Sequence, residues 1–137
     1  MKKLNVILIA TVLVVLMSPA RSAYAEWKEL GSNAAMVVYV DLATISDNGE
    51  KSQIMSMLDF KAPGKNPNNM QTVNSIVGLN EYNCAETIYR PIAWKEFSGE
   101  KGTGKVVSDN STPDSKFEPV IDNTWTAGVF NVACRKR

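Results

Sequence analysis

Two cysteines, Cys84 and Cys134, place the strongest constraint on what this chain can fold into. They are the only cysteines in the sequence, so a disulfide within the chain has a single possible pairing. The bridge would close a loop of about 50 residues and, by a chain-entropy argument, stabilise the folded state by about 4 kcal/mol. Redox-active pairs usually lie close together as C-x-x-C, and these two do not. We therefore predict a structural disulfide.

A disulfide persists in an oxidising compartment, and the start of the chain predicts export to one. Two lysines precede an apolar run over 4–17, and the small-residue triplet Ala-Tyr-Ala follows at 23–25. This is the order of a cleaved secretory signal peptide. The apolar run is shorter than the roughly 20 residues that span a bilayer, which disfavours the alternative of a retained anchor. We expect residues 1–25 to be removed, residues 26–137 to form a single domain, and the protein to be periplasmic, secreted or at the cell surface.

Charge and composition argue against several classes of function. The leader holds three of the 15 basic residues and none of the 14 acidic ones, so the net charge of +1 becomes −2 in the mature chain. Nucleic-acid-binding domains carry a strong basic excess instead. The sequence has no histidine, which removes the commonest general base and metal ligand. With both cysteines bridged, a Cys/His zinc site is excluded as well. We expect no nucleic-acid partner, metal or cofactor.

The mature chain has mostly the pattern of strands. Apolar runs over 35–45 and 53–60 flank the turn signal Asp-Asn-Gly-Glu at 47–50, which predicts a β-hairpin. We expect further strands at 26–30, 70–79 and 84–94, a short one at 105–107, and loops at 61–69 and 108–116. Pro91 predicts an edge strand or a strand end at its position.

The C-terminal segment is compatible with two structures. The polar residues 122–124 could cap a helix, and four apolar residues would then share one helical face: Trp125, Val129, Val132 and Ala133. The alternation of Trp125, Ala127 and Val129 would also suit a strand. We favour a short helix that Cys134 holds against the sheet. The fold class is then α+β, with about five to six strands and one C-terminal helix.

Two carboxylates suggest a hydrolase. Asp41 and Asp59 lie near the ends of the two predicted hairpin strands, and a facing pair of carboxylates could act as acid and base, as in glycosidases. The alternative is that they end strands and accept hydrogen bonds from turn amides. We favour this alternative, and we predict no catalytic residues and no enzymatic activity.

Aromatic and basic residues alternate in one stretch of the chain. The aromatic members are Tyr82, Tyr89, Trp94 and Phe97. Such mixtures are typical of binding surfaces, but also of strands whose aromatic face lies in the core. We expect at least half of these aromatic residues to be core residues. The basic residues Arg90, Lys95 and Lys105 are therefore our candidates for partner contact.

The order of features along the chain resembles a known family. Trp27 is followed by Val-Tyr-Val-Asp-Leu-Ala-Thr-Ile at 38–45, Met-Ser-Met-Leu-Asp-Phe at 55–60, Glu-Tyr-Asn-Cys at 81–84 with Tyr-Arg just after it, and a terminal Cys134. This order resembles the bacterial surface-adhesin protein E family over nearly all of residues 26–134.

The resemblance implies both a fold and a function. The fold would be a curved antiparallel sheet with the C-terminal helix held against it by the disulfide. The function would be that of a non-enzymatic surface protein that binds host extracellular-matrix or serum proteins, through a sheet face, edge or loop. The alternative that we retain is a periplasmic inhibitor or envelope assembly factor that binds another bacterial protein.

Overall fold

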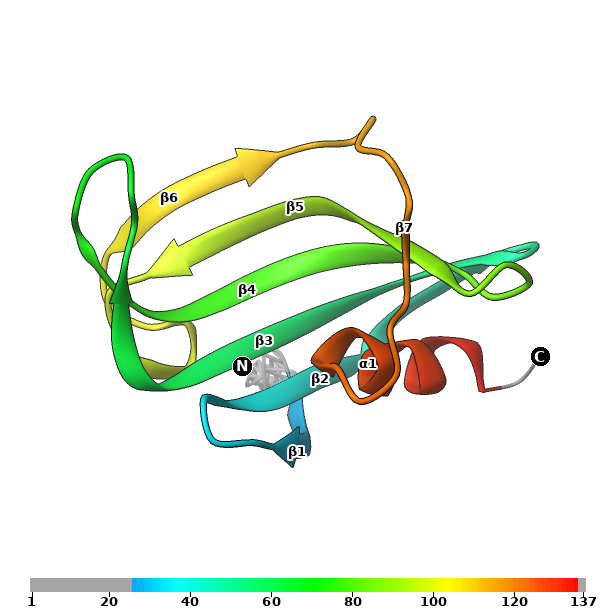
Figure 1. The fold of residues 1–137 in the computed structure, drawn as a ribbon, viewed down its shortest axis with the longest axis horizontal. Helices are drawn as coiled ribbons and strands as arrows, with labels where there is room; N and C mark the ends of the chain where they lie inside the picture. The colour runs from blue at the N-terminus through cyan, green and yellow to red at the C-terminus, as the bar shows by residue number, and fades with distance from the viewer. Residues whose placement is uncertain (1–25, 136–137) are drawn as a thin grey trace, which may run out of the picture.

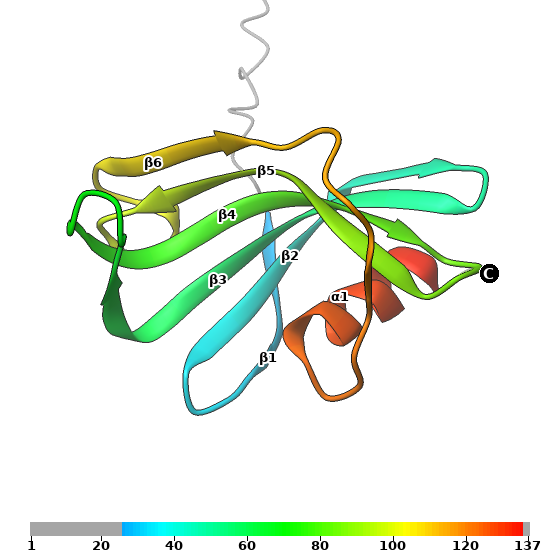
Figure 2. The same ribbon diagram turned by 45° about the horizontal axis from the view of Figure 1, so that its top comes forward.

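The computed structural model describes residues 26–135, so the predicted leader at 1–25 lies outside the described residues. A seven-stranded sheet dominates the fold, and its first six strands pair in chain order, each antiparallel to the next. The strands are β1 (Trp27–Ser32), β2 (Met36–Asn48), β3 (Lys51–Lys65), β4 (Thr72–Asn83), β5 (Ile88–Phe97), β6 (Val106–Ser111) and the short β7 (Glu118–Pro119), which pairs with β5. A short 3-10 turn, η1 (Glu100–Gly102), precedes β6, and the helix α1 (Trp125–Cys134) follows β7. The sheet curves, and α1 lies across one of its faces (Figures 1 and 2).

The predicted hairpin is confirmed as β2 and β3, which turn at Gly49 with a positive φ of 65°. The predicted loop at 61–69 is wrong in its first half, because β3 continues to Lys65. Pro63 is tolerated there because the ladder between β3 and β4 is interrupted between Asp59 and Gly64, where no N–H is needed for pairing. The predicted loop at 108–116 likewise begins too early, since β6 extends to Ser111.

The helical prediction for the C-terminus is confirmed. Thr124 is the N-cap, and its Oγ1 accepts a hydrogen bond from the backbone N of Ala127 at 3.3 Å. The disulfide joins Cys84, just after β4, to Cys134 in the last turn of α1, with 5.5 Å between the Cα atoms. The bridge therefore holds the helix against the sheet, as predicted.

The two faces of the sheet differ in what covers them. We call the face that carries α1 the helix face, and its core includes the fully buried Ile54, Tyr82 and Val129. The other face, which we call the opposite face, is covered in part by η1. The backbone N of Lys101 in η1 donates to Oδ1 of Asp59 at 2.9 Å, and η1 packs on β3 and β4.

Candidate binding groove

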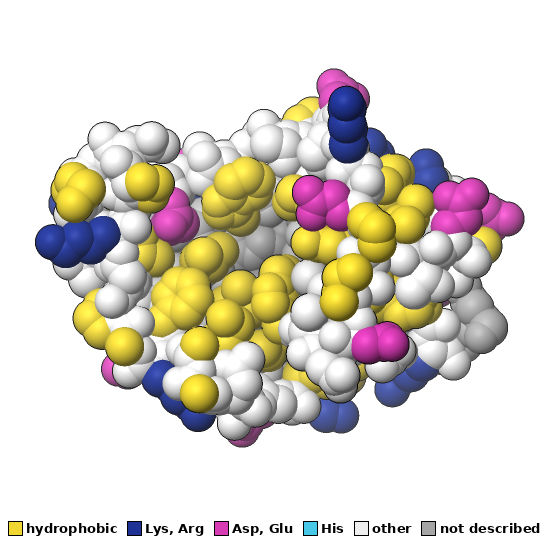
Figure 3. All heavy atoms as spheres, in the orientation of Figure 1, with side chains coloured by type: hydrophobic (Ala, Val, Ile, Leu, Met, Phe, Trp, Pro, Cys, Tyr) yellow, Lys and Arg dark blue, Asp and Glu magenta, His cyan; other side chains and the backbone are white. Residues whose placement is uncertain are grey.

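The helix leaves part of its own face uncovered. Beside the start of α1, a groove of about 290 Å³ remains open between the sheet, β7 and the helix. Six apolar or aromatic side chains line it: Leu58, Ile76, Tyr89, Pro91, Trp94 and Trp125. Figure 3 shows these kinds of side chains gathered around a hollow on the helix face. Groove-lining aromatic residues in a half-buried setting are typical anchors of protein interfaces.

The hollow exists because two neighbouring strands place very small residues at the same level. Ser56 of β3 is the direct cross-strand partner of Gly78 of β4, and both line the groove. Gly78 also faces Trp94 of β5, and a Cβ atom on Gly78 would lie only 3.2 Å from the Cβ of Trp94. Glycine therefore allows the tryptophan to approach the strand closely, and the missing side chain volume becomes the floor of the groove.

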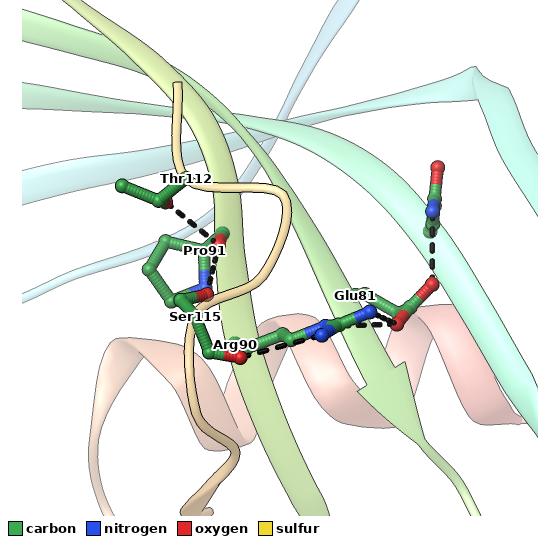
Figure 4. Close-up of polar contacts among 6 residues, drawn as sticks. Glu81, Arg90, Pro91, Thr112 and Ser115 are labelled. Carbon is green, nitrogen blue, oxygen red and sulfur yellow. Dashed lines mark hydrogen bonds and ion pairs between the residues drawn. The ribbon is translucent and has the colours of Figure 1, made fainter. Parts of the chain in front are cut away.

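The edge of the groove is built by a segment that we call the strap, residues 112–120. The ladder between β4 and β5 is irregular beside Pro91. The Pro91 carbonyl accepts hydrogen bonds from two strap hydroxyls, Thr112 Oγ1 at 3.0 Å and Ser115 Oγ at 2.6 Å (Figure 4). These bonds hold the start of the strap against β5, and the β7 part of the strap then pairs with β5 and brings Glu118 to the groove.

The ionisable groups at the groove are acidic or phenolic. Glu118 is exposed, and its Oε2 accepts a hydrogen bond from the Tyr89 hydroxyl at 3.4 Å. Burial raises the pKa of Tyr89, and the charge of Glu118 and this hydrogen bond raise it further. A second acid, Glu96, is the cross-strand partner of Ile76, which lines the groove. Acidic side chains stand on both sides of the hollow, and lysines and arginines lie toward the periphery of this view (Figure 3).

Arg90, one of the three predicted contact residues, contributes mainly to the fold. Its guanidinium pairs with Glu81 (Nη2 to Oε1, 2.9 Å) and donates to the Ser115 carbonyl (Figure 4). It also lies 4.6 Å from the centroid of the Phe117 ring. Burial tends to raise the pKa of Glu81, but hydrogen bonds from Gln53 and Arg90 and the Arg90 charge outweigh it and hold this pKa below its ordinary value. Arg90 thus anchors the strap to the sheet.

The other two predicted contact residues are more accessible. Lys95 lies on the opposite face, because it pairs across the strands with Val77, whose neighbour Ile76 faces the groove. Its Nζ lies 3.9 Å from Oδ2 of Asp109, and both side chains are more than half exposed. Lys105 is exposed just before β6. Neither lysine lines the groove.

The facing carboxylates that the hydrolase alternative requires are not formed. Asp41 pairs across the ladder with Met55, whereas Asp59 pairs with Val37, so the two positions are about 13 Å apart along the strands. Glycosidase carboxyl groups are about 5 to 9.5 Å apart. Each aspartate instead accepts a hydrogen bond from a backbone amide, Ala43 N for Asp41 and Lys101 N for Asp59. The favoured alternative is correct about backbone amides but wrong about strand ends, because Asp41 lies within β2 and Asp59 lies within β3.

The groove was not predicted from the sequence. There, Trp125 was expected on the packed face of the helix, and only basic residues were predicted to contact a partner. The available signal was the pair Ser56 and Gly78 within otherwise apolar strand faces, which is meaningful only once the register of β3 and β4 is known.

Over residues 26–135, the fold brings together no group of three histidine, cysteine or acidic side chains that could hold a metal ion. In the same range, no helix has both the length and the apolar character needed to cross a bilayer.

Comparison with known families identifies the fold that carries this groove. The sequence profile described as Surface-adhesin protein E matches residues 27–135. The chain belongs to the surface-adhesin protein E family. Membership in an adhesin family indicates a binding protein at the surface or otherwise exported. Comparison with curated protein sequences finds no match.

Solved structures of Haemophilus influenzae protein E have the same fold as this member of the family. One crystal form superposes with a TM-score of 0.58 at 13% sequence identity, covering 82% of this chain and 90% of that chain. Protein E from non-typeable Haemophilus influenzae superposes with a TM-score of 0.54 at 13% identity, covering 85% of this chain and 80% of that chain. At this identity the likeness concerns the fold alone.

Proposed function

We propose that this protein is an exported bacterial binding protein that recognises a protein partner through the groove on its helix face. The observation that carries the proposal is an open groove walled by Tyr89, Trp94 and Trp125 in a chain of an adhesin family. Aromatic residues in partly desolvated pockets supply much of the affinity of protein interfaces. The small residues on the floor provide the depth that an anchoring side chain needs.

We further propose that the partner is a host extracellular-matrix or serum protein. The family description, the predicted leader and the disulfide all support a protein that works outside the cytoplasm. The competing partner is a protein of the bacterial envelope, for which this chain would be an inhibitor or assembly factor.

The basic residues form a second possible contact surface. Because Arg90 already pairs with Glu81 and packs on Phe117, Lys95 and Lys105 carry this hypothesis. A partner that binds there would be acidic, whereas the groove would bind an apolar side chain.

Localisation combined with a binding screen tests the proposed function. Intact cells are treated with protease, and the purified protein is applied to immobilised matrix and serum proteins and to immobilised envelope proteins. We expect digestion on intact cells and saturable binding to at least one matrix or serum protein. Protection until the outer membrane is opened, together with binding only to an envelope protein, would replace adhesion by the periplasmic alternative. No saturable binding in either panel would contradict a binding function.

A further inference from the structure

We infer that the groove selects a basic side chain, a lysine or arginine that lies next to an apolar residue on the surface of the partner protein. This inference rests on the proposed function, because it specifies the chemistry of the partner at the same groove. It differs from the hypothesis of a contact surface at Lys95 and Lys105, which would bind an acidic partner.

The charges around the groove favour a cation. Glu118 lines the groove and is exposed. Glu96 lies on the helix face beside Ile76, outside the groove lining, and its Oε1 accepts hydrogen bonds from the Asn66 amide and the Ser108 hydroxyl, so it adds negative charge at a distance. The lining residues include no lysine or arginine. The two basic residues of β5, Arg90 and Lys95, both lie on the opposite face, where Arg90 pairs with Glu81 and the Nζ of Lys95 lies 3.9 Å from Asp109. A basic side chain entering the groove would therefore meet negative charge without a competing cation, and an acidic one would be repelled.

The walls of the groove suit the rest of such a side chain. Lysine and arginine have apolar stems that pack on apolar surface while the charged end reaches a polar partner. Leu58 and Ile76 provide apolar surface for a stem, and Tyr89, Trp94 and Trp125 provide aromatic rings that attract a cation. The Tyr89 hydroxyl, which donates to Glu118, directs that carboxylate along the same edge.

The size of the groove favours a side chain over a larger ligand. Its volume of about 290 Å³ lies just below the range for small-molecule pockets, which is about 300 to 1,000 Å³. One or two side chains of a protein segment are therefore a better match than a bulky cofactor.

Three short peptides test the inference directly. They are identical, with leucine on both sides of a central lysine, norleucine or glutamate, and they contain no tryptophan, so the fluorescence of the protein tryptophans reports binding. We expect the lysine peptide to bind about fivefold or more tightly than the norleucine peptide, the glutamate peptide to bind most weakly, and added salt to reduce the preference for lysine. Norleucine is more apolar than lysine, so equal or tighter binding of its peptide would overturn the inference. Failure of the lysine peptide to bind at all would also overturn it.

Matched variants assign the effect to the groove. Glu118→Gln keeps the shape of an exposed side chain and removes its charge, and we expect it to weaken the lysine peptide about two- to fivefold while leaving the norleucine peptide unchanged. Glu29→Gln is the control, because Glu29 is exposed on β1 opposite Tyr39 and lies outside the groove. Equal effects of the two variants would contradict selection by Glu118.

Trp94→Leu separates failure of the inference from failure of the proposed function. If Trp94→Leu abolishes binding of the peptides and of the protein partner but Glu118→Gln changes nothing, the groove binds without charge selection, and only the inference fails. If Trp94→Leu, checked for folding by thermal denaturation, leaves partner binding intact, the groove is not the binding site, and both fail. Binding to phosphatidylcholine vesicles without binding of the lysine peptide would mean that the groove takes a lipid cation, and it would overturn the protein-segment inference.

Discussion

The two faces of the sheet differ in what their exposed side chains contact. On the opposite face, charged side chains have partners within the chain: Arg90 pairs with Glu81, Lys95 with Asp109, and the Lys101 Nζ lies 5.7 Å from the centroid of the Tyr39 ring. On the helix face, α1 covers only part of the apolar surface, and the aromatic groove stays open. Surface charge therefore does not locate the proposed binding site in this protein, because many of the charged side chains stabilise the fold through contacts within the chain.

Of the variants that compare the two faces, removal of the disulfide should lower stability most, because the bridge holds α1 on the helix face. The double variant Cys84→Ala with Cys134→Ala should lose about 4 kcal/mol of unfolding free energy, the entropy of closing a loop of about 50 residues. Urea denaturation of the oxidised protein and of the variant measures it. An unchanged denaturation midpoint would show that α1 is held by packing alone.

Two buried residues on the same strand compare the faces directly. Ile54 packs under α1 and Met57 lies on the η1 side, and both are 0% exposed. We expect Ile54→Ala to cost about 3 to 4 kcal/mol and Met57→Ala about 2 to 3 kcal/mol, because the η1 loop can settle into the space more easily than a disulfide-held helix. Denaturation curves for both variants give the comparison, and the reverse order would mean that the main core lies under η1.

A smaller effect is expected from the Glu81–Arg90 pair, and it should depend on pH. The pKa of Glu81 is lowered in the folded protein, so its stabilising contribution is complete above the ordinary value of 4.5 and is lost as the pH falls below that value. Glu81→Gln should therefore cost about 1 kcal/mol at neutral pH, and the gap to the wild type should narrow below pH 4.5. A gap that stays constant down to pH 3 would contradict the proposed ionic role.

Much of the fold follows from local patterns in the sequence. The β2–β3 hairpin is encoded by two apolar runs around Gly49, and α1 by a capping threonine before a helical apolar stripe. The end of β3 was misplaced because Pro63 and Gly64 signal a loop locally, whereas pairing with β4 resumes after an interruption of the ladder. That pairing is a tertiary effect that overrides local propensity.

The groove could not be predicted because it depends on register between strands. Ser56 and Gly78 are 22 residues apart in sequence and become neighbours only in the paired sheet. The sequence leaves open whether Trp94 lies in the core or on the surface. Its position depends on which part of the β5 face α1 leaves uncovered. Arg90 was singled out for its charge, but its partners Glu81 and Phe117 come from β4 and the strap.

The central claim is that partner binding uses the groove on the helix face and not the cations Lys95 and Lys105. The most direct test of this claim compares the partner affinity of the wild type with that of two variants. They are Trp94→Leu and the double variant Lys95→Ala with Lys105→Ala. We predict at least a tenfold loss for Trp94→Leu and less than a twofold change for the lysine variant. A large loss in the lysine variant with unchanged affinity in Trp94→Leu would contradict the claim and place the binding surface around Lys95 and Lys105.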